Sequence, residues 1–72
     1  MEKIIELKDD FIRLDQALKL GDLVQSGGHA KLLIQEGQVM VNVEVEYRRG
    51  KKLLAGDRVS LEGQELLNEK NM

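Results

Sequence analysis

A chain of 72 residues that contains no cysteine must hold its fold together by apolar packing. Domains of this size bury only about 60% of the surface that the unfolded chain exposes, and many short domains add disulfides or a metal. The single histidine, His29, cannot form a structural zinc site by itself. We therefore expect one domain spanning residues 1–72, with one apolar core and with neither a metal nor a cofactor.

Charge is unevenly distributed along the chain. The run Arg48-Arg49-Gly50-Lys51-Lys52 carries four positive charges, and since the whole chain has a net charge of −2, the rest of it carries −6. A concentrated basic site on an acidic body favours one docking face for an anion. Taken alone, the run fits a solvated turn, kept soluble by its charge, equally well.

The first half of the chain predicts a strand and two helices. Residues 3–7 have the β-branched content of a short strand, which a polar turn at residues 8–10 ends. A helix of about two turns follows, with apolar residues at i, i+3 and i+4 from Leu14 and with Gly21 as its stop. A second helix begins after Ser26, a good N-cap, and closes at Gly37.

Two glycines stand in the first turn of this second helix, where each costs about 1 kcal/mol relative to alanine. The presence of Gly27 and Gly28 at this unfavourable position therefore calls for an explanation. Either another backbone or a phosphate approaches the helix N-terminus closely, or the glycines simply make the turn flexible.

From Val39 to Tyr47 the apolar period changes to two, which predicts a hairpin, and residues 58–62 form a final strand. Residues 64–72 are polar and are expected to fray, so the core covers about residues 3–62. The predicted fold class is α+β, with two helices packed on a small, mainly antiparallel, twisted sheet.

Signatures of catalysis are missing from the sequence. There is no cysteine nucleophile, no glycine-rich phosphate loop and no cluster of histidines. Asp9 and Asp10 fall in a predicted turn and are better explained as a cap before the helix than as a catalytic pair. His29 has no evident base partner, and it is either a ligand contact or an exposed or packed side chain. We expect no catalytic residue.

Features that suit nucleic acid are stronger as a set than singly. The basic run supplies charge, Lys31 lies on the polar side of the second helix, and the N-terminus of that helix offers free N–H groups to phosphate. Phe11 and Tyr47, the only aromatic residues, fall in apolar patterns that predict core positions. Without stacking platforms, recognition of RNA by shape and backbone is favoured over the reading of successive single-stranded bases.

An ordered series of motifs carries a family resemblance. The motifs are Arg13-Leu14-Asp15-Gln16-Ala17-Leu18, Ser26-Gly27-Gly28-His29-Ala30-Lys31-Leu32-Leu33-Ile34, Gly37-Gln38-Val39-Met40-Val41-Asn42 and Gly56-Asp57-Arg58-Val59. The chain from about Ile12 to Leu61 resembles the S-four RNA-binding domain, the module named after ribosomal small-subunit protein four. Its form looks like the stand-alone bacterial branch of this family.

The resemblance implies an αL-type RNA-binding motif whose surface is made by the two helices and the loop after the hairpin. The implied RNA contacts are Arg13, Ser26, Gly27, Gly28, His29, Lys31, Arg48, Arg49, Lys51 and Lys52. The implied core residues are Leu14, Leu18, Ala30, Leu33, Ile34, Val39 and Val41. Asp15 either orients a neighbouring basic residue or is structural.

Two departures from the family pattern matter. Many members have Asn-Gly at the hairpin, where this chain has Asn42-Val43, and valine is costly at positive φ. We therefore expect a different hairpin turn. Many members also have arginine where this chain has Gly27, which leaves backbone contacts as the expected interaction there.

These observations predict a non-catalytic protein that binds structured RNA. The family implies ribosomal RNA or a ribosomal particle in assembly, with transfer RNA as a further possibility. The alternative is a protein-interaction adaptor whose basic loop docks on an acidic partner. The charged, interrupted N-terminus predicts a cytoplasmic protein without a membrane partner.

Overall fold

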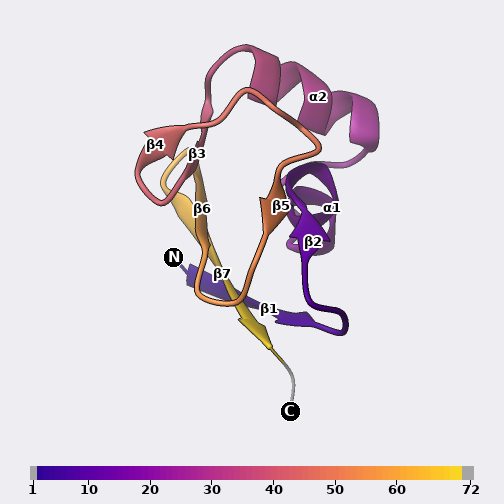
Figure 1. The fold of residues 1–72 in the computed structure, drawn as a ribbon. Helices are drawn as coiled ribbons and strands as arrows, with labels where there is room; N and C mark the ends of the chain where they lie inside the picture. Colours follow the sequence, from indigo (N-terminus) through magenta and orange to yellow (C-terminus); the bar gives the residue numbers. More distant parts are fainter. Residues whose placement is uncertain (1, 71–72) are drawn as a thin grey trace.

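The computed structural model describes residues 2–70, which form one five-stranded sheet, one two-stranded sheet and two helices (Figure 1). The strands of the larger sheet are β1 (Glu2–Leu7), β7 (Gln64–Lys70), β6 (Arg58–Leu61), β3 (Val39–Val41) and β4 (Glu44–Val45), in this spatial order. Only β1 and β7 pair in parallel, and the other neighbours are antiparallel. The predicted α+β class with a mainly antiparallel sheet is confirmed.

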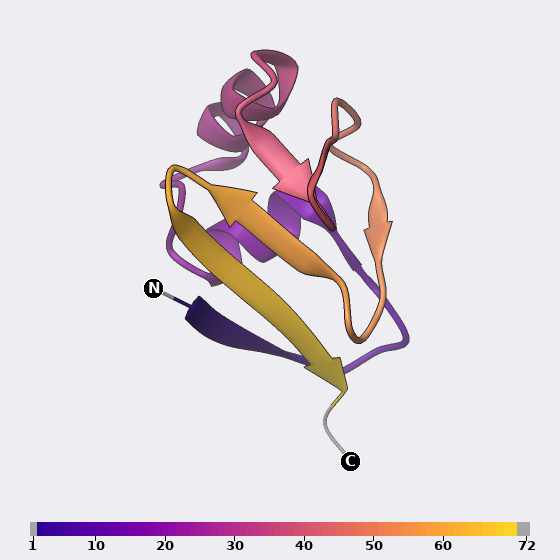
Figure 2. The same ribbon diagram turned by 90° about the vertical axis from the view of Figure 1, so that its left-hand side faces the viewer.

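Both helices cover the same face of the sheet, and the opposite face is open (Figure 2). Helix α1 (Leu14–Leu20) follows the short strand β2 (Ile12–Arg13), which pairs with β5 (Lys52–Leu53) in the second sheet. Helix α2 (Gly27–Gln35) precedes β3. All of the predicted core residues are buried between the helices and the sheet, namely Leu14, Leu18, Ala30, Leu33, Ile34, Val39 and Val41.

Local signals placed the ends of both helices correctly. The N–H of Gly21 donates to Ala17 O at 2.9 Å and so closes α1. Ser26 Oγ accepts from the N–H of His29 at 3.1 Å, as an N-cap does. After α2, Gly37 has a φ of 75°, the left-handed conformation that a closing glycine supplies.

The expectation of a frayed tail is wrong for residues 64–70, which form β7 in the interior of the sheet between β1 and β6. Leu66 and Asn68 point to the helix side and are fully buried. The backbone and side-chain N–H groups of Asn68 both donate to Asp57 O, at 3.1 and 2.9 Å. The polar composition misled the prediction because the charged residues of β7 lie on its solvent face and at its end. Residues 71–72 lie outside the described part of the chain.

The expectation of a different hairpin turn is also wrong. Asn42 and Val43 occupy the two turn positions between β3 and β4, with φ values of 51° and 65°. Two positive φ angles at the central residues are the signature of a type I′ turn. Val43 therefore stands where many members of the resembled family have glycine, in a conformation that is strained for a β-branched residue.

Candidate nucleic-acid interface

The basic run forms a loop that is bonded to the beginning of α1. The N–H of Leu14 donates to Lys51 O at 2.9 Å, and the N–H of Asp15 donates to Arg49 O at 3.1 Å. The first N–H groups of a helix have no partner within it, so the loop satisfies two of them. Next to the hydrogen bond between Leu14 and Lys51, Arg13 of β2 pairs in register with Lys52 of β5. The fold thus brings Arg13 and the basic run together, although they are far apart in sequence.

Asp15 combines the two roles that the sequence left open for it. Its Oδ1 lies 3.6 Å from Arg13 Nε and also accepts from the N–H of Gln16 at 2.9 Å. The carboxylate therefore accepts a backbone hydrogen bond in the first turn of α1 and forms an ion pair with the guanidinium of Arg13 beside the loop.

Arg48 differs from the other cations of the loop because Glu46 binds it. The Glu46 carboxylate accepts from the N–H, Nε and Nη2 of Arg48 at 3.0, 3.1 and 3.2 Å. Through these hydrogen bonds Arg48 lowers the pKa of Glu46, and Glu46 raises the pKa of Arg48. Glu46 was not singled out from the sequence, although it shares one face of the period-two pattern with Arg48. The loop therefore offers less free charge than its composition suggests.

The beginning of α2 presents unsatisfied backbone donors. Ser26 Oγ accepts from the N–H of His29, and His29 Nδ1 in turn accepts from the N–H of Gln25 at 3.3 Å. Among the described residues, no acceptor serves the N–H groups of Gly27 and Gly28. The space beside both glycines is open, with only Ser26 Oγ near 4 Å from a Cβ at Gly28. No backbone within residues 2–70 approaches them, so the possibilities that remain for the glycines are a phosphate or turn flexibility.

Helix α2 and the basic loop lie at the same end of the molecule, at the top in both views (Figures 1 and 2). Lys31 is exposed on α2. No hydrogen bond or ion pair joins the first turn of α2, or Lys31, to the loop in the described part of the chain. The predicted site residues thus form two groups on one end of the protein, one around Arg13 and the loop, the other on α2.

Both aromatic residues are exposed, so their predicted core positions are wrong. Phe11 is 41% exposed and Tyr47 is 63% exposed. The Nζ of Lys52 lies 4.8 Å from the centroid of the Phe11 ring, a cation–π distance. Tyr47 lies over Gly37, where an added Cβ would approach its hydroxyl to 3.2 Å. Each ring packs on one neighbour at the surface, and both flank the basic loop.

Comparison with known proteins identifies the module that carries this surface. The family model described as S4 domain matches residues 5–67. The chain belongs to the S4 domain family. The first helix, the capped second helix and the hairpin of this S4 domain are the elements on which the sequence resemblance rested.

Relatives of this S4 domain span nearly the same length. It is 48% identical over 63 residues to the "Probable ribosome maturation protein RlbA" of Bacillus subtilis strain 168, covering 88% of this chain and 89% of the relative. It is 43% identical over 56 residues to the "Putative RNA-binding protein YbcJ" of Escherichia coli K12, covering 78% and 80%. The solution structure of YbcJ, described as revealing an αL motif involved in RNA-binding, superposes with a TM-score of 0.71 at 37% identity, covering 92% and 85%.

Neither helix within residues 2–70 has the length and the apolar character that a membrane span requires. No group of three or more metal-ligating side chains comes together within the same residues.

Proposed function

We propose that this protein binds structured RNA through a basic face made by Arg13, the loop cations Arg48, Arg49, Lys51 and Lys52, the first turn of α2 (Ser26, Gly27, Gly28 and His29) and Lys31. The observation that carries the proposal is the bonding of the loop to α1, through Leu14 N–H to Lys51 O and Asp15 N–H to Arg49 O. A basic loop that served only solubility would not need a fixed backbone. A loop whose cations must match the spacing of phosphates needs its backbone held in place.

The geometry supports recognition of backbone and shape. Neither Arg49 nor Lys51 forms an ion pair within 4.0 Å among the described residues, although Lys51 interacts with the charge of Glu46, so both side chains can reach phosphates. The free N–H groups of Gly27 and Gly28, at the positive end of the α2 dipole, form a second phosphate-binding group. Two groups of phosphate contacts on one end of a rigid domain suit a folded RNA, which proteins recognise largely by its backbone and shape.

Ribosomal RNA, or a ribosomal particle during assembly, is the ligand we propose first, because the Bacillus subtilis relative is named as a ribosome maturation protein. Transfer RNA is the second ligand to test. We further propose that the protein acts in the cytoplasm and without catalysis, as a binding module. An adaptor role would instead appear as copurification of an acidic protein that survives nuclease treatment.

Salt dependence tests this proposal directly. Replacing Arg48, Arg49, Lys51 and Lys52 together by glutamine should abolish sedimentation with ribosomal particles at low salt. The slope of log affinity against log salt for ribosomal RNA should fall by roughly 0.7–0.9 for each lost phosphate contact. Thermal stability should change little, because exposed charges contribute little to folding.

The control removes two cations that lie outside the basic face. Arg58 pairs with Glu2 and Lys70 pairs with Asp10, so Arg58→Gln combined with Lys70→Gln lowers the net charge without touching the face. This double variant should retain the parent slope. Equal affinity and slope in the quadruple variant and the parent would refute the proposal and make the loop a soluble turn.

A further inference from the structure

The open face of the sheet carries an ordered pattern on β1 and β7, which lie at the opposite end of the molecule from α2 (Figure 1). Side chains alternate between the two faces of a strand, and the buried residues of β1 and β7 point to the helices. Three pairs of directly opposed residues therefore point to the open face, namely Glu2 with Glu65, Ile4 with Leu67, and Glu6 with Glu69. We call these six residues the acidic sheet face.

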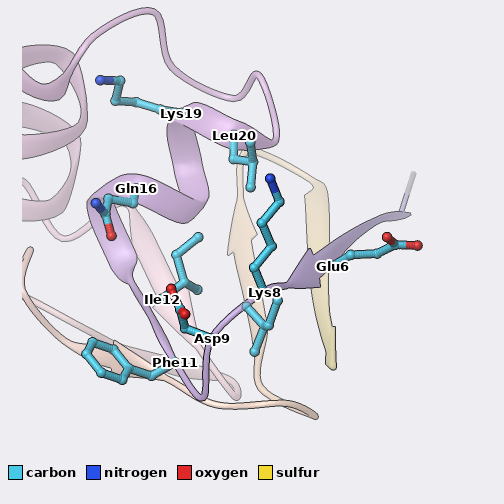
Figure 3. A pocket seen from close by; sticks show the side chains of 9 residues that line it. Glu6, Lys8, Asp9, Phe11, Ile12, Gln16, Lys19 and Leu20 are labelled. Carbon is cyan, nitrogen blue, oxygen red and sulfur yellow. The ribbon is translucent and has the colours of Figure 1, made fainter. Parts of the chain in front are cut away.

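The lysines of the same segments do not neutralise this face. Lys3 Nζ donates to a backbone oxygen at the end of α1 at 2.9 Å, and Lys70 binds Asp10. Figure 3 shows the Glu6 side chain extending away from α1, whereas the Lys8 side chain extends toward the end of that helix. The charges of this part of the chain are therefore separated between the two sides of the sheet.

The acidic sheet face has a formal charge of −3, because Arg58 of β6 adds one guanidinium to its four carboxylates. Arg58 binds Glu2. The carboxylates of Glu6, Glu65 and Glu69 form no ion pair within 4.0 Å among residues 2–70. A face of this sign repels a polyanion such as RNA and attracts a cationic partner.

The pattern is unfavourable for the protein by itself. Like charges directly opposite each other on neighbouring strands are destabilising, and this occurs twice, at Glu2 with Glu65 and at Glu6 with Glu69. Between these two pairs, the side chain of Ile4 remains 57% exposed. A cationic partner with an apolar residue between its charges would remove both costs.

The spacing of the pattern indicates the size of the partner. A strand rises about 3.3 Å per residue, so successive pairs lie about 6.6 Å apart and the two acidic pairs lie about 13 Å apart. One metal ion does not span that distance. An α-helix rises about 1.5 Å per residue, so its residues i, i+4 and i+8 follow one another at about 6 Å, close to the spacing of the three pairs.

We propose that the acidic sheet face docks a helix of a basic partner protein that carries a cation, an apolar residue and a second cation at positions i, i+4 and i+8. The two cations lie over the acidic pairs, and the apolar side chain lies over Ile4 and Leu67. This docking is separate from the proposed RNA binding, which uses the other end of the molecule. Together the two surfaces make the domain a link between a structured RNA and a basic protein.

Three alanine-based helical peptides test the proposal by NMR titration of the isotope-labelled protein. The first carries arginine, leucine and arginine at i, i+4 and i+8, and the second has the leucine moved to i+6, on the opposite side of the helix. The third has glutamate in place of both arginines. The first peptide should shift the amide signals of β1 and β7 and should bind roughly 10-fold more tightly than the second, which cannot bury its leucine. The third peptide should not bind.

Glu6→Gln combined with Glu69→Gln removes one acidic pair and should weaken binding of the first peptide roughly 2- to 30-fold, as expected for the loss of one or two exposed ion pairs. Glu36→Gln combined with Glu44→Gln makes the same change of charge at exposed positions outside the face and should keep the parent affinity. The first double variant should also be more stable than the parent in urea, because a like-charge pair is removed. A gain of stability together with a loss of affinity distinguishes a docking role from a structural one.

Equal affinity for the two arginine peptides, or equal losses in the two double variants, would overturn the proposal and leave only a diffuse attraction between opposite charges. The absence of shift changes on β1 and β7 at millimolar peptide would also overturn it. Spermidine that displaced the first peptide at equal concentration would make the face a site for small polycations instead. No RNA is present in these titrations, so their outcome is independent of the proposed function, which the quadruple glutamine variant of the basic loop tests.

Discussion

Asn42 and Asp57, which lie in two different turns, are joined by a hydrogen bond of 3.0 Å from Asn42 Nδ2 to Asp57 Oδ1. Asn42 Oδ1 accepts from the N–H of Arg58 at 2.9 Å, and Asp57 Oδ2 accepts from the N–H of Leu54 at 2.7 Å. These contacts fix Asn42 as the first residue of the hairpin turn. The next residue, Val43, must then take the left-handed conformation that the turn requires.

Replacing Val43 by glycine should stabilise the protein. Val43 is 83% exposed, so little packing is lost, and relief of the left-handed strain is worth about 1 kcal/mol. Val45→Gly is the matched control, because Val45 lies in β4, where glycine should destabilise by roughly 0.5–1 kcal/mol. Equilibrium unfolding in urea measures both. A loss of stability in Val43→Gly would show that the turn is not strained in solution.

Leu33→Ala should lower the free energy of unfolding by about 2–5 kcal/mol, because Leu33 belongs to the apolar core. The adjacent residue provides the control. Leu32 is 53% exposed on the same helix, and Leu32→Ala should change stability by no more than about 0.5 kcal/mol. Similar losses in the two variants would mean that the buried face of α2 is assigned wrongly.

Leu66→Ala tests the structural role of β7. Leu66 is fully buried in the interior of the sheet, so we expect a loss of about 2–5 kcal/mol in denaturant unfolding. Leu54→Ala, at an exposed position outside the strands, should leave the midpoint nearly unchanged. A Leu66→Ala protein as stable as the parent would restore the picture of a frayed C-terminal segment.

The hydrogen bonds from Arg48 hold the pKa of Glu46 below its ordinary value. Carboxyl NMR titration should therefore show a higher Glu46 pKa in Arg48→Gln than in the parent. By linkage, a lowered pKa in the folded state contributes stability that is present above the ordinary carboxyl pKa and is lost as the pH falls through the lowered value. Stability of the parent should accordingly fall more steeply in acid than that of Arg48→Gln. Identical titration curves would show that the pair does not persist in solution.

Glu46→Gln should strengthen RNA binding at low salt. The substitution removes a negative charge next to the loop and weakens the hold on Arg48, whose guanidinium then becomes available to a phosphate. The slope of log affinity against log salt should steepen by roughly 0.7–0.9 if Arg48 gains one phosphate contact. Glu62→Gln, an exposed residue in the turn between β6 and β7, is the charge-matched control and should leave the slope unchanged. Unchanged binding in Glu46→Gln would place Arg48 outside the RNA surface.

Much of this protein follows from its sequence because the deciding interactions are local. Helix periodicity identified the buried helix faces on which Leu14 and Leu33 lie. The helix caps at Ser26 and Gly37 depend on residues within one turn. Strand alternation likewise placed Val39 and Val41 in the core. The four cations of the basic loop were also visible, since charge density along a short run needs no tertiary information.

Contacts between distant segments were decided only by the tertiary structure. Strand β7 pairs in parallel with β1, which joins residue 2 to residue 65, and no local pattern in a polar segment reveals such a partner. The register of β2 with β5 brings Arg13 beside Lys52 and leaves Phe11 at the surface beneath an ammonium group. Periodicity reports which side of an element is apolar. Whether a neighbouring element covers that side depends on long-range packing. For this reason the sequence pattern predicted a buried Phe11 and a frayed C-terminal segment, whereas in the folded chain Phe11 is exposed and residues 64–70 form an interior strand.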